Sequence, residues 1–184
     1  MVDPRTDEEL MRVYCAGDAV AFDVLFERYA DLLLRVARRH LETEDQARDV
    51  VQETFVRVHA ARFDFRTDAR LRPWVLTIAM NLVREHWRRT KRRKTSVDDT
   101  LDRRAAPAEE QGPIETRQRA EALHAALRRL PDSQREVVEL HWIQELPFAE
   151  VARIVGTSEG AVRVRAHRAY KTLKELLQLE LGHE

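Results

Sequence analysis

Basic side chains gather on one side of a helix predicted to begin near Ser158. His167, Arg168 and Lys171 lie opposite the apolar stripe of that helix, together with Gly160 and Val164. Arg163 and Arg165 flank this face. Arginine can bind guanine through two hydrogen bonds or clamp a phosphate. This face therefore predicts binding to duplex DNA, and a solvated basic face on a core helix is the simpler alternative.

Two helices and a tight turn are needed to present that face. The run from Phe148 to Val155 has helical spacing, Gly156 ends it, and Thr157 or Ser158 offers an N-cap oxygen. The apolar stripe of the second helix recurs every three or four residues: Val162, Ala166, Ala169, Leu173 and Leu177. Two helices joined by a turn with Gly are the helix-turn-helix pattern, whose second helix enters the major groove.

A second candidate site for nucleic acid lies in the N-terminal half. A helix predicted from Trp74 to about Arg89, with Pro73 at its first position, is apolar over most of its circumference. Its polar residues form one narrow stripe, and aromatic and arginine side chains precede it in a loop: Thr77, Asn81, Arg84 and Arg88 on the helix, and Phe63, Phe65 and Arg66 in the loop. Aromatic and guanidinium planes stack on unpaired bases, which favours single-stranded or distorted nucleic acid. A core helix with arginine at its C-terminal end is the alternative, and it explains Arg88 alone.

A third feature is an apolar residue surrounded by polar ones. On a helix predicted to run to about Ala61, the side opposite the core carries Val56 with Asp49, Gln52 and Glu53 around it. A polar rim around an apolar residue is typical of a protein contact. From these residues alone, a solvated face with one exposed valine is the simpler interpretation.

Catalytic and metal-binding patterns are missing from the sequence. The histidines are scattered without a spacing such as HExxH, and neither a Gly-rich phosphate loop nor a GxSxG elbow occurs. The single cysteine, Cys15, excludes an internal disulfide and a cysteine-based metal cage. We therefore expect no catalytic residues, no metal and no cofactor. A dimeric helix-turn-helix repressor is the closest rival, but no heptad seam or spare apolar face supports it.

Composition limits the remaining choices. The 184 residues allow one or two domains, and 35% charged residues with only 5 Gly suit an all-α protein. The net charge is zero, yet the first thirty residues are acidic and Arg84 to Lys94 is strongly basic. No apolar run approaches the roughly 20 residues needed to span a bilayer. The acidic N-terminus does not resemble a signal peptide, so we expect a cytoplasmic protein.

The predicted helices fall into two small helical domains joined by a flexible linker. Capping boxes (Thr6 with Glu9, Thr43 with Gln46) open two helices, and Asp18 can cap a helix from Ala19 to His40. Helical spacing resumes near Thr116, and Asp132 can cap the helix before the helix-turn-helix. The predicted boundaries are residues 1–94 for the first domain, 95–115 for the linker and 116–184 for the second domain.

In the order of its parts the chain resembles the extracytoplasmic-function (ECF) sigma factors of the sigma-70 family. The resemblance covers nearly the whole length. Besides the helix-turn-helix, it rests on four segments: AGDAVAFDVLFERY (16–29), DQARDVVQETFVRV (45–58), FRTDARLRPWVLTIAMNLVREHWRR (65–89) and LRRLPDSQREVVELHW (127–142).

The resemblance implies partners and a role for each candidate surface. Core RNA polymerase would dock through the clamp helices of its largest subunit on Asp49, Gln52, Glu53 and Val56. The minus-ten promoter element, with a flipped-out base, would be held by Phe63, Phe65, Arg66, Asp68, Trp74, Thr77, Asn81, Arg84 and Arg88. The minus-thirty-five element would be read by Ser158, Arg163, Val164, Arg165, His167, Arg168 and Lys171. An anti-sigma factor that holds the two domains together is a further expected partner.

Overall fold

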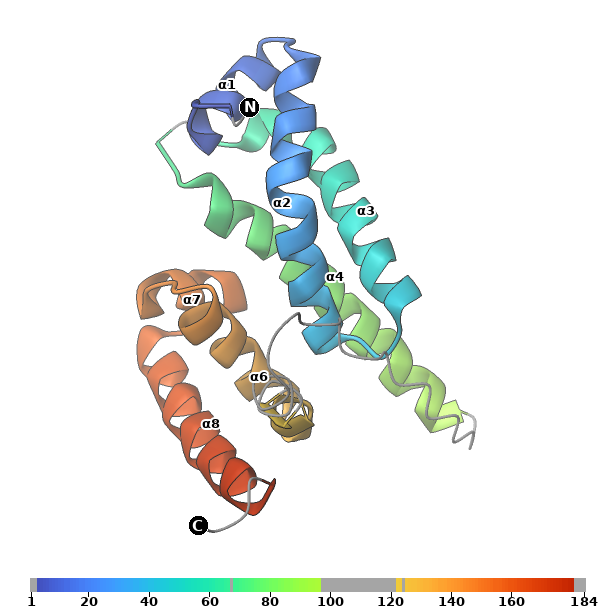
Figure 1. Ribbon diagram of the computed structural model, residues 1–184, viewed down its shortest axis with the longest axis vertical. Coiled ribbons are helices and arrows are strands. Elements are labelled where there is room, and N and C mark those ends of the chain that lie inside the picture. Colours follow the sequence, from blue (N-terminus) through green and yellow to red (C-terminus); the bar gives the residue numbers. More distant parts are fainter. Residues whose placement is uncertain (1–2, 67, 97–121, 124, 181–184) are drawn as a thin grey trace, which may run out of the picture. The chain divides into compact units, whose positions relative to one another are not determined.

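The computed structural model describes residues 3–66, 68–96, 122–123 and 125–180. Within these residues every regular element is a helix, which confirms the all-α fold class. Contacts divide the chain into two compact units, Met1–Arg103 and Arg104–Glu184, referred to below as the N-terminal and C-terminal units (Figure 1).

The N-terminal unit begins with two helices whose capping residues were predicted correctly. Helix α1 (Asp7–Cys15) has the complete capping box, because Thr6 accepts from the N–H of Glu9 and Glu9 accepts from the N–H of Thr6. Helix α2 (Ala19–His40) is capped by Asp18, whose carboxylate accepts the N–H groups of its first turn. Helix α2 then packs against α1 on one side and α3 (Glu44–Ala60) on the other.

The start of α3 differs from the predicted capping box in one detail. Thr43 accepts the N–H of Gln46 at 3.2 Å, as expected. The side-chain oxygen of Gln46, however, accepts the N–H of Glu42 at 3.2 Å rather than that of Thr43. The side chain of Gln46 thus returns to the residue before the N-cap, one position earlier than in a capping box.

Helix α4 (Leu71–Ser96) is longer at both ends than the predicted helix from Trp74 to about Arg89. Pro73 is its third residue, a position where a missing N–H costs nothing because the first four N–H groups of a helix lack intrahelical acceptors. The N–H of Leu71 instead donates to a carboxylate oxygen of Glu8, from α1, at 2.9 Å. The sequence could not show this cap because 63 positions separate the two residues.

The core of the N-terminal unit is built around the middle of α4. Its largest fully buried side chains come from α1, α2, α3 and α4: Leu10, Met11, Leu33, Val36, Val50, Leu71, Leu76, Met80 and Val83. Phe26 on α2 lies at the edge of this core: it is 44% exposed, and its ring packs on Phe55 with centroids 4.6 Å apart. Between α3 and α4, the Arg57 guanidinium donates to both carboxylate oxygens of Glu85 at 3.1 Å.

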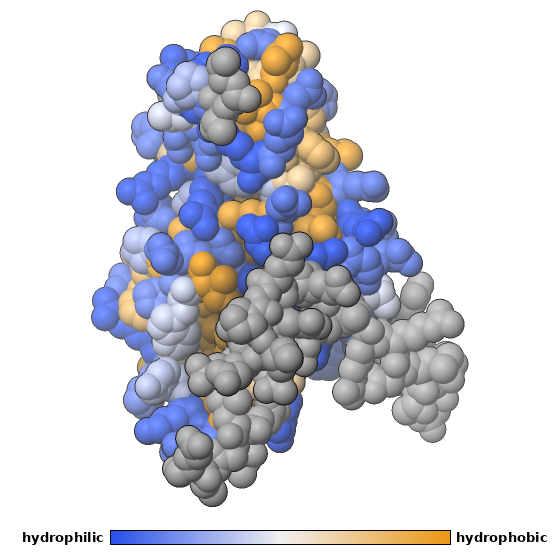
Figure 2. Space-filling view, viewed as in Figure 1, coloured by the Kyte–Doolittle hydropathy of each residue, from blue (hydrophilic) through white to orange (hydrophobic). Residues whose placement is uncertain are grey.

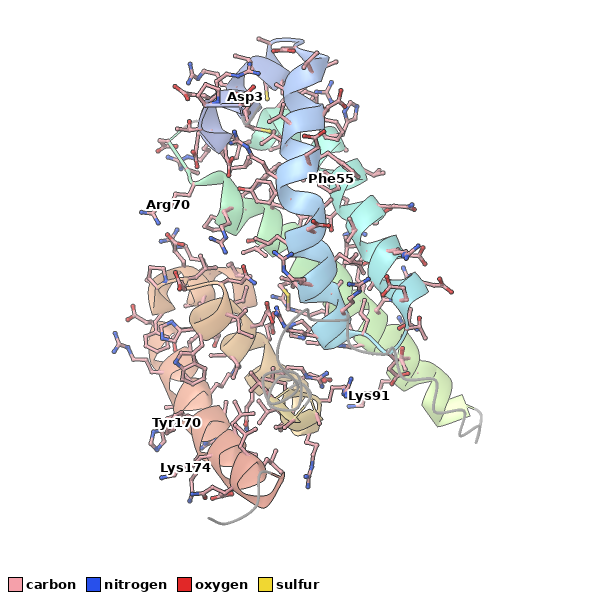
Figure 3. The ribbon with its side chains drawn as sticks, in the orientation of Figure 1. Asp3, Phe55, Arg70, Lys91, Tyr170 and Lys174 are labelled. Atoms are coloured by element: carbon pink, nitrogen blue, oxygen red, sulfur yellow. The ribbon has the colours of Figure 1, made fainter. Side chains whose placement is uncertain are left out.

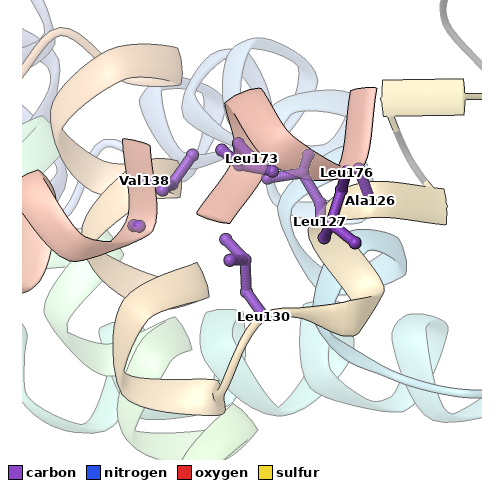
Figure 4. Close-up of a cluster of buried hydrophobic side chains, with 7 residues drawn as sticks. Ala126, Leu127, Leu130, Val138, Leu173 and Leu176 are labelled. Carbon is purple, nitrogen blue, oxygen red and sulfur yellow. The ribbon is translucent and has the colours of Figure 1, made fainter. Parts of the chain in front are cut away.

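The C-terminal unit contains a helical segment over residues 125–129, α6 (Asp132–Val138), the π-helix η2 (Glu139–Ile143), α7 (Phe148–Val155) and α8 (Glu159–Glu180). Figure 4 shows its apolar cluster: Ala126, Leu127, Leu130, Val138, Ala169, Leu173 and Leu176. Leu176 is more buried than the predicted Leu177, which only borders the cluster. Asp132 is the first residue of α6 rather than its cap, and its carboxylate accepts from Arg135 at 2.9 Å.

Most of the predicted linker and the following helix start lie outside the described residues. Residues 95–96 of that linker belong to the end of α4, and residues 97–121 are not described. Along the described chain, no helix combines the length and the apolar character that crossing a membrane requires.

Candidate nucleic-acid interface

The turn between α7 and α8 has the geometry that the sequence predicts. Gly156 follows α7 with φ +68° and ψ +43°, a left-handed conformation that glycine adopts without steric cost. The N–H of Thr157 donates to the carbonyl of Ala152 at 3.0 Å. The side chain of Ser158 then accepts the N–H of Ala161 at 3.2 Å, so one hydrogen bond closes the end of α7 and another caps the start of α8.

Helix α8 buries one face and exposes the other, as its sequence pattern predicts. Val162, Ala166 and Ala169 are at most 3% exposed. The exposed side carries Ser158 at the cap and the predicted DNA-facing residues Arg163, Val164, His167, Arg168 and Lys171, whereas Arg165 is half-buried. A helix with one face packed and a basic face open to solvent can enter a DNA groove without rearrangement.

Two arginines on this exposed face are held differently. The Arg163 guanidinium pairs with Glu159 at 2.5 Å and lies 5.1 Å from the ring centre of Phe148 on α7. Phe148 is itself stacked on His141 with centroids 3.8 Å apart. Arg168 has no ion pair within the described part of the chain, so it can turn toward a phosphate or a base without first losing a partner.

In the N-terminal unit, α3 is followed by the short helix η1 (Arg62–Asp64) and then by residues 65–66 and 68–70, called the η1–α4 loop below. The ring of Phe63 is 70% exposed, with the Arg62 guanidinium 4.3 Å from its centre. Phe65 differs from the expectation, because its ring is only 8% exposed and packs on Trp74 at 5.3 Å. Phe63 is thus presented to solvent, whereas Phe65 is buried against Trp74, which is itself half-buried.

Two further residues of the predicted set close the η1–α4 loop. The Arg66 guanidinium pairs with Asp68 at 2.8 Å, and both side chains are exposed. The hydrogen bond and charge of Arg66 lower the pKa of the Asp68 carboxyl. The N–H of Ala69 donates to the carbonyl of Arg66 at 2.9 Å, so the ion pair spans a hydrogen-bonded turn.

The side chains of the predicted polar stripe on α4 form hydrogen bonds within the helix itself. Thr77 donates to the carbonyl of Pro73 at 2.7 Å, and Arg84 donates to the side-chain oxygen of Asn81 at 2.5 Å. Arg88 donates to the carbonyl of Arg84 at 3.3 Å. Asn81 and Arg88 are exposed, whereas Thr77 and Arg84 are half-buried. Figure 3 shows that Arg70 and Lys91 place further positive charge toward the two ends of this helix.

An open pocket of about 450 Å³ lies between the end of α3, η1 and α4. Its lining includes Asn81 together with residues that the sequence analysis missed: Arg57, Ala60, Ala61, Asp64 and Ile78. The two adjacent alanines were the available signal, because small side chains at the end of α3 leave room beside α4. The lining combines the apolar side chains of Ala60, Ala61 and Ile78 with the polar groups of Arg57, Asp64 and Asn81, so it can receive a flat, partly polar ring.

The surface of α3 that was predicted to bind protein is exposed as expected. Asp49, Gln52, Glu53 and Val56 all lie on the solvent side, and Val56 is 60% exposed. Glu53 pairs with Arg57 at 3.0 Å. Arg57 also pairs with Glu85 on α4, and this hydrogen-bonded contact lowers the pKa of the Glu85 carboxyl. Apolar side chains also reach the surface over α2, where Figure 2 shows them within a largely hydrophilic face.

The described residues contain no group of three His, Cys, Asp or Glu that could hold a metal ion. Cys15 is half-buried, and burial raises the pKa of its thiol. Its Sγ donates to the carbonyl of Arg62 at 3.2 Å. A thiol with a raised pKa forms little thiolate at neutral pH, which disfavours a nucleophilic role.

Comparison with known proteins connects these two surfaces. Residues 25–93 match sigma-70 region 2, and residues 120–173 match sigma-70 region 4. The chain is 35% identical over 177 residues to the ECF RNA polymerase sigma factor SigM of Mycobacterium tuberculosis, a match that covers 94% of this chain and 85% of SigM. This chain belongs to the ECF sigma factors of the sigma-70 family.

Other relatives and solved structures agree with this assignment. The sigma factor CarQ of Myxococcus xanthus is 34% identical, over 90% of this ECF sigma factor and 94% of CarQ. The structure of CnrH in complex with the cytosolic domain of CnrY is similar with a TM-score of 0.70 at 28% identity, covering 94% of this chain and 97% of that one. The sigma factor RpoE of Bartonella quintana, solved with the anti-sigma factor NepR, has a TM-score of 0.70 at 26% identity, with 83% and 96% covered.

The family match divides the residues of this ECF sigma factor unevenly. The region 2 match contains most of α2, α3, η1, the η1–α4 loop and most of α4, and the region 4 match contains α6, η2, α7 and α8 as far as Leu173. Helix α1 lies outside both matched ranges.

Proposed function

We propose that this ECF sigma factor directs core RNA polymerase to promoters by holding two DNA segments with separate units. The observation that carries the proposal is the presence, in one chain, of an exposed aromatic ring and an open pocket in the N-terminal unit and an exposed basic helix face in the C-terminal unit. The first suits an unpaired strand and the second suits duplex DNA. A sigma factor needs both.

The C-terminal unit is proposed to read the minus-thirty-five element through the start of α8. Ser158, Arg163, Val164, Arg165, His167, Arg168 and Lys171 are the proposed contacts. The packed and paired Arg163 would enter the groove in a fixed orientation, and Arg168 would adapt to a phosphate or a base. Val164, 50% exposed, offers an apolar contact of the kind that thymine methyl groups make.

The N-terminal unit is proposed to hold the minus-ten element as a melted strand. Phe63 would stack on a base, and the pocket beside Asn81 would receive one that has left the duplex. Arg66, Asp68, Thr77, Arg84 and Arg88 would follow the strand, and Phe65 and Trp74 would keep the loop in shape. Extruding a base costs a few kcal/mol, which stacking on an aromatic ring, about 1–3 kcal/mol per base, offsets.

Core polymerase is proposed to dock on the exposed side of α3, at Asp49, Gln52, Glu53 and Val56, through the clamp helices of its largest subunit. The link from Glu53 through Arg57 to Glu85 supports this surface, because it holds α3 and α4 together behind the contact. An anti-sigma factor is proposed as the inhibitor, since the similar RpoE of Bartonella quintana was solved with the anti-sigma factor NepR.

The proposed domain boundaries are residues 1–94 and 116–184, with a linker over 95–115. A tether raises the effective concentration of each DNA-binding unit at its own element, so neither needs high affinity alone. The proposed function includes no catalysis by the chain itself and no cofactor. Both units would act in the cytoplasm, where polymerase and DNA are found.

Run-off transcription with purified core polymerase over a promoter library tests the proposal. We expect RNA to start only when the chain is present, from templates that share a minus-ten and a minus-thirty-five motif. A chain that forms a dimer by light scattering, binds a palindrome tightly without polymerase and starts no RNA would be a repressor instead.

A further inference from the structure

The η1–α4 loop and η1 before it are tied to a helix that lies far away in the sequence. Beyond the end of the loop, the N–H of Leu71 donates to a carboxylate oxygen of Glu8 at 2.9 Å. Before its start, the Tyr14 hydroxyl is hydrogen-bonded to Nδ1 of His59, and Sγ of Cys15 donates to the carbonyl of Arg62. The single short helix α1 therefore contacts the chain on both sides of the loop.

The contact of Glu8 is the one with the clearest electrostatic basis. The N–H of Leu71 is the first of the four donors that a helix N-terminus leaves without an intrahelical acceptor. A carboxylate at this position also interacts favourably with the positive end of the helix dipole. Because Trp74 follows in the first turn of α4 and supports Phe65, the position of this turn sets the position of the loop.

Helix α1 is itself held firmly enough to act as an anchor. The carboxylate of Asp7 accepts from the Arg28 guanidinium at 2.6 Å and from the Tyr29 hydroxyl at 2.5 Å, both on α2. Leu10 and Met11 are completely buried. A shift of α1 would therefore break buried contacts with α2 before it could release the loop.

We propose that Glu8 is a positioning residue for base selection in the minus-ten element, acting through the first turn of α4 on the η1–α4 loop. The inference rests on the proposed function of that loop. It concerns a helix that lies before residue 25, where the match to sigma-70 region 2 begins. Glu8 touches no DNA in this account, and its effect is on where Phe63 and the pocket lie relative to the strand.

Transcription by the complete holoenzyme tests this on templates that differ only in the bases of the minus-ten element. Removing the carboxylate with Glu8→Ala should lower the preference for the best base about fivefold, the size expected for loss of a helix cap. Glu8→Gln keeps an oxygen acceptor but loses the charge, so it should lower that preference about twofold. Sensitivity to changes in the minus-thirty-five element should stay unchanged in both variants.

Glu9→Ala is the matched control, because it removes the capping box of α1 itself without touching the loop. It should keep the preference at the minus-ten element. Full preference in both Glu8 variants, or an equal loss in Glu9→Ala, would overturn the inference while leaving the proposed function intact. A wild-type holoenzyme that starts no RNA would instead refute the proposed function, and the inference with it.

Discussion

The two surfaces that we propose to bind DNA are built in different ways. On α8, the exposed residues Arg163 and Arg168 and the buried residues Val162 and Ala166 belong to one continuous helix. The surface around Phe63 instead combines the end of α3, η1, the η1–α4 loop and α4, with a cap supplied by α1. The first surface is set by helical periodicity, whereas the second depends on contacts between distant parts of the chain.

This difference predicts how each surface responds to substitution. A change on the exposed side of α8 removes a contact and leaves the helix in place, because the packing face is separate. A change in the N-terminal unit can act directly on the strand or indirectly through the supports of the loop. Substitutions can therefore separate the two surfaces by their effect on each promoter element.

The largest effect is expected from Arg168→Glu. Reversing this charge replaces a contact to phosphate or base by repulsion, so run-off transcription should fall about a hundredfold, while binding to core polymerase stays unchanged. Arg128→Glu is the matched control, because Arg128 is also an exposed arginine but lies outside α8, in the segment whose apolar side chains pack near Leu173 and Leu176. Loss of polymerase binding together with transcription would contradict the assignment of α8.

A smaller loss is expected from Phe63→Ala. Without the ring, one base loses its stacking partner, and open-complex formation should fall about tenfold, as measured by permanganate reactivity of thymines in the minus-ten element. Phe63→Trp keeps an aromatic plane and should retain most of the activity. Equal opening by the alanine and tryptophan variants would show that Phe63 does not stack on DNA.

The α3 surface gives a third comparison, independent of DNA. Val56→Glu should weaken the binding of core polymerase about fivefold, because a charge replaces an apolar residue at the proposed contact. Val20→Glu on α2 is the control, as Val20 is 64% exposed and Val56 60%. If the two variants bind core polymerase equally well in a titration, the proposed docking surface is wrong.

The smallest effect is expected on stability, from an ion pair that joins α2 and α3 within the N-terminal unit. Arg38 donates to both oxygens of Glu44 at 2.6 and 2.7 Å, which lowers the pKa of Glu44 from 4.5 to about 2. Because the folded pKa is the lower one, this stabilisation is complete above pH 4.5 and is lost as pH falls toward about 2. Glu44→Gln should therefore lower the free energy of unfolding by less than about 1 kcal/mol at pH 7, and the difference should shrink below pH 4.5 in urea titrations. A constant difference across this range would contradict the assignment.

The sequence predicted the C-terminal surface better than the N-terminal one because the C-terminal surface depends on residues that are close together in the chain. Gly156, the cap at Ser158 and the exposed side of α8 all follow from residues a few positions apart. The pocket beside Asn81 and the burial of Phe65 depend on packing across more distant segments, which periodicity does not show. The early start of α4 was missed because its cap, Glu8, lies on another helix.

The division of labour between the two units can be measured with one set of holoenzymes and templates. Transcription by wild type, Phe63→Ala and Arg168→Glu would be compared on promoters altered in either the minus-ten or the minus-thirty-five element. The account predicts that Phe63→Ala loses discrimination only at the minus-ten element and Arg168→Glu only at the minus-thirty-five element. Loss of discrimination at both elements in each variant would contradict it.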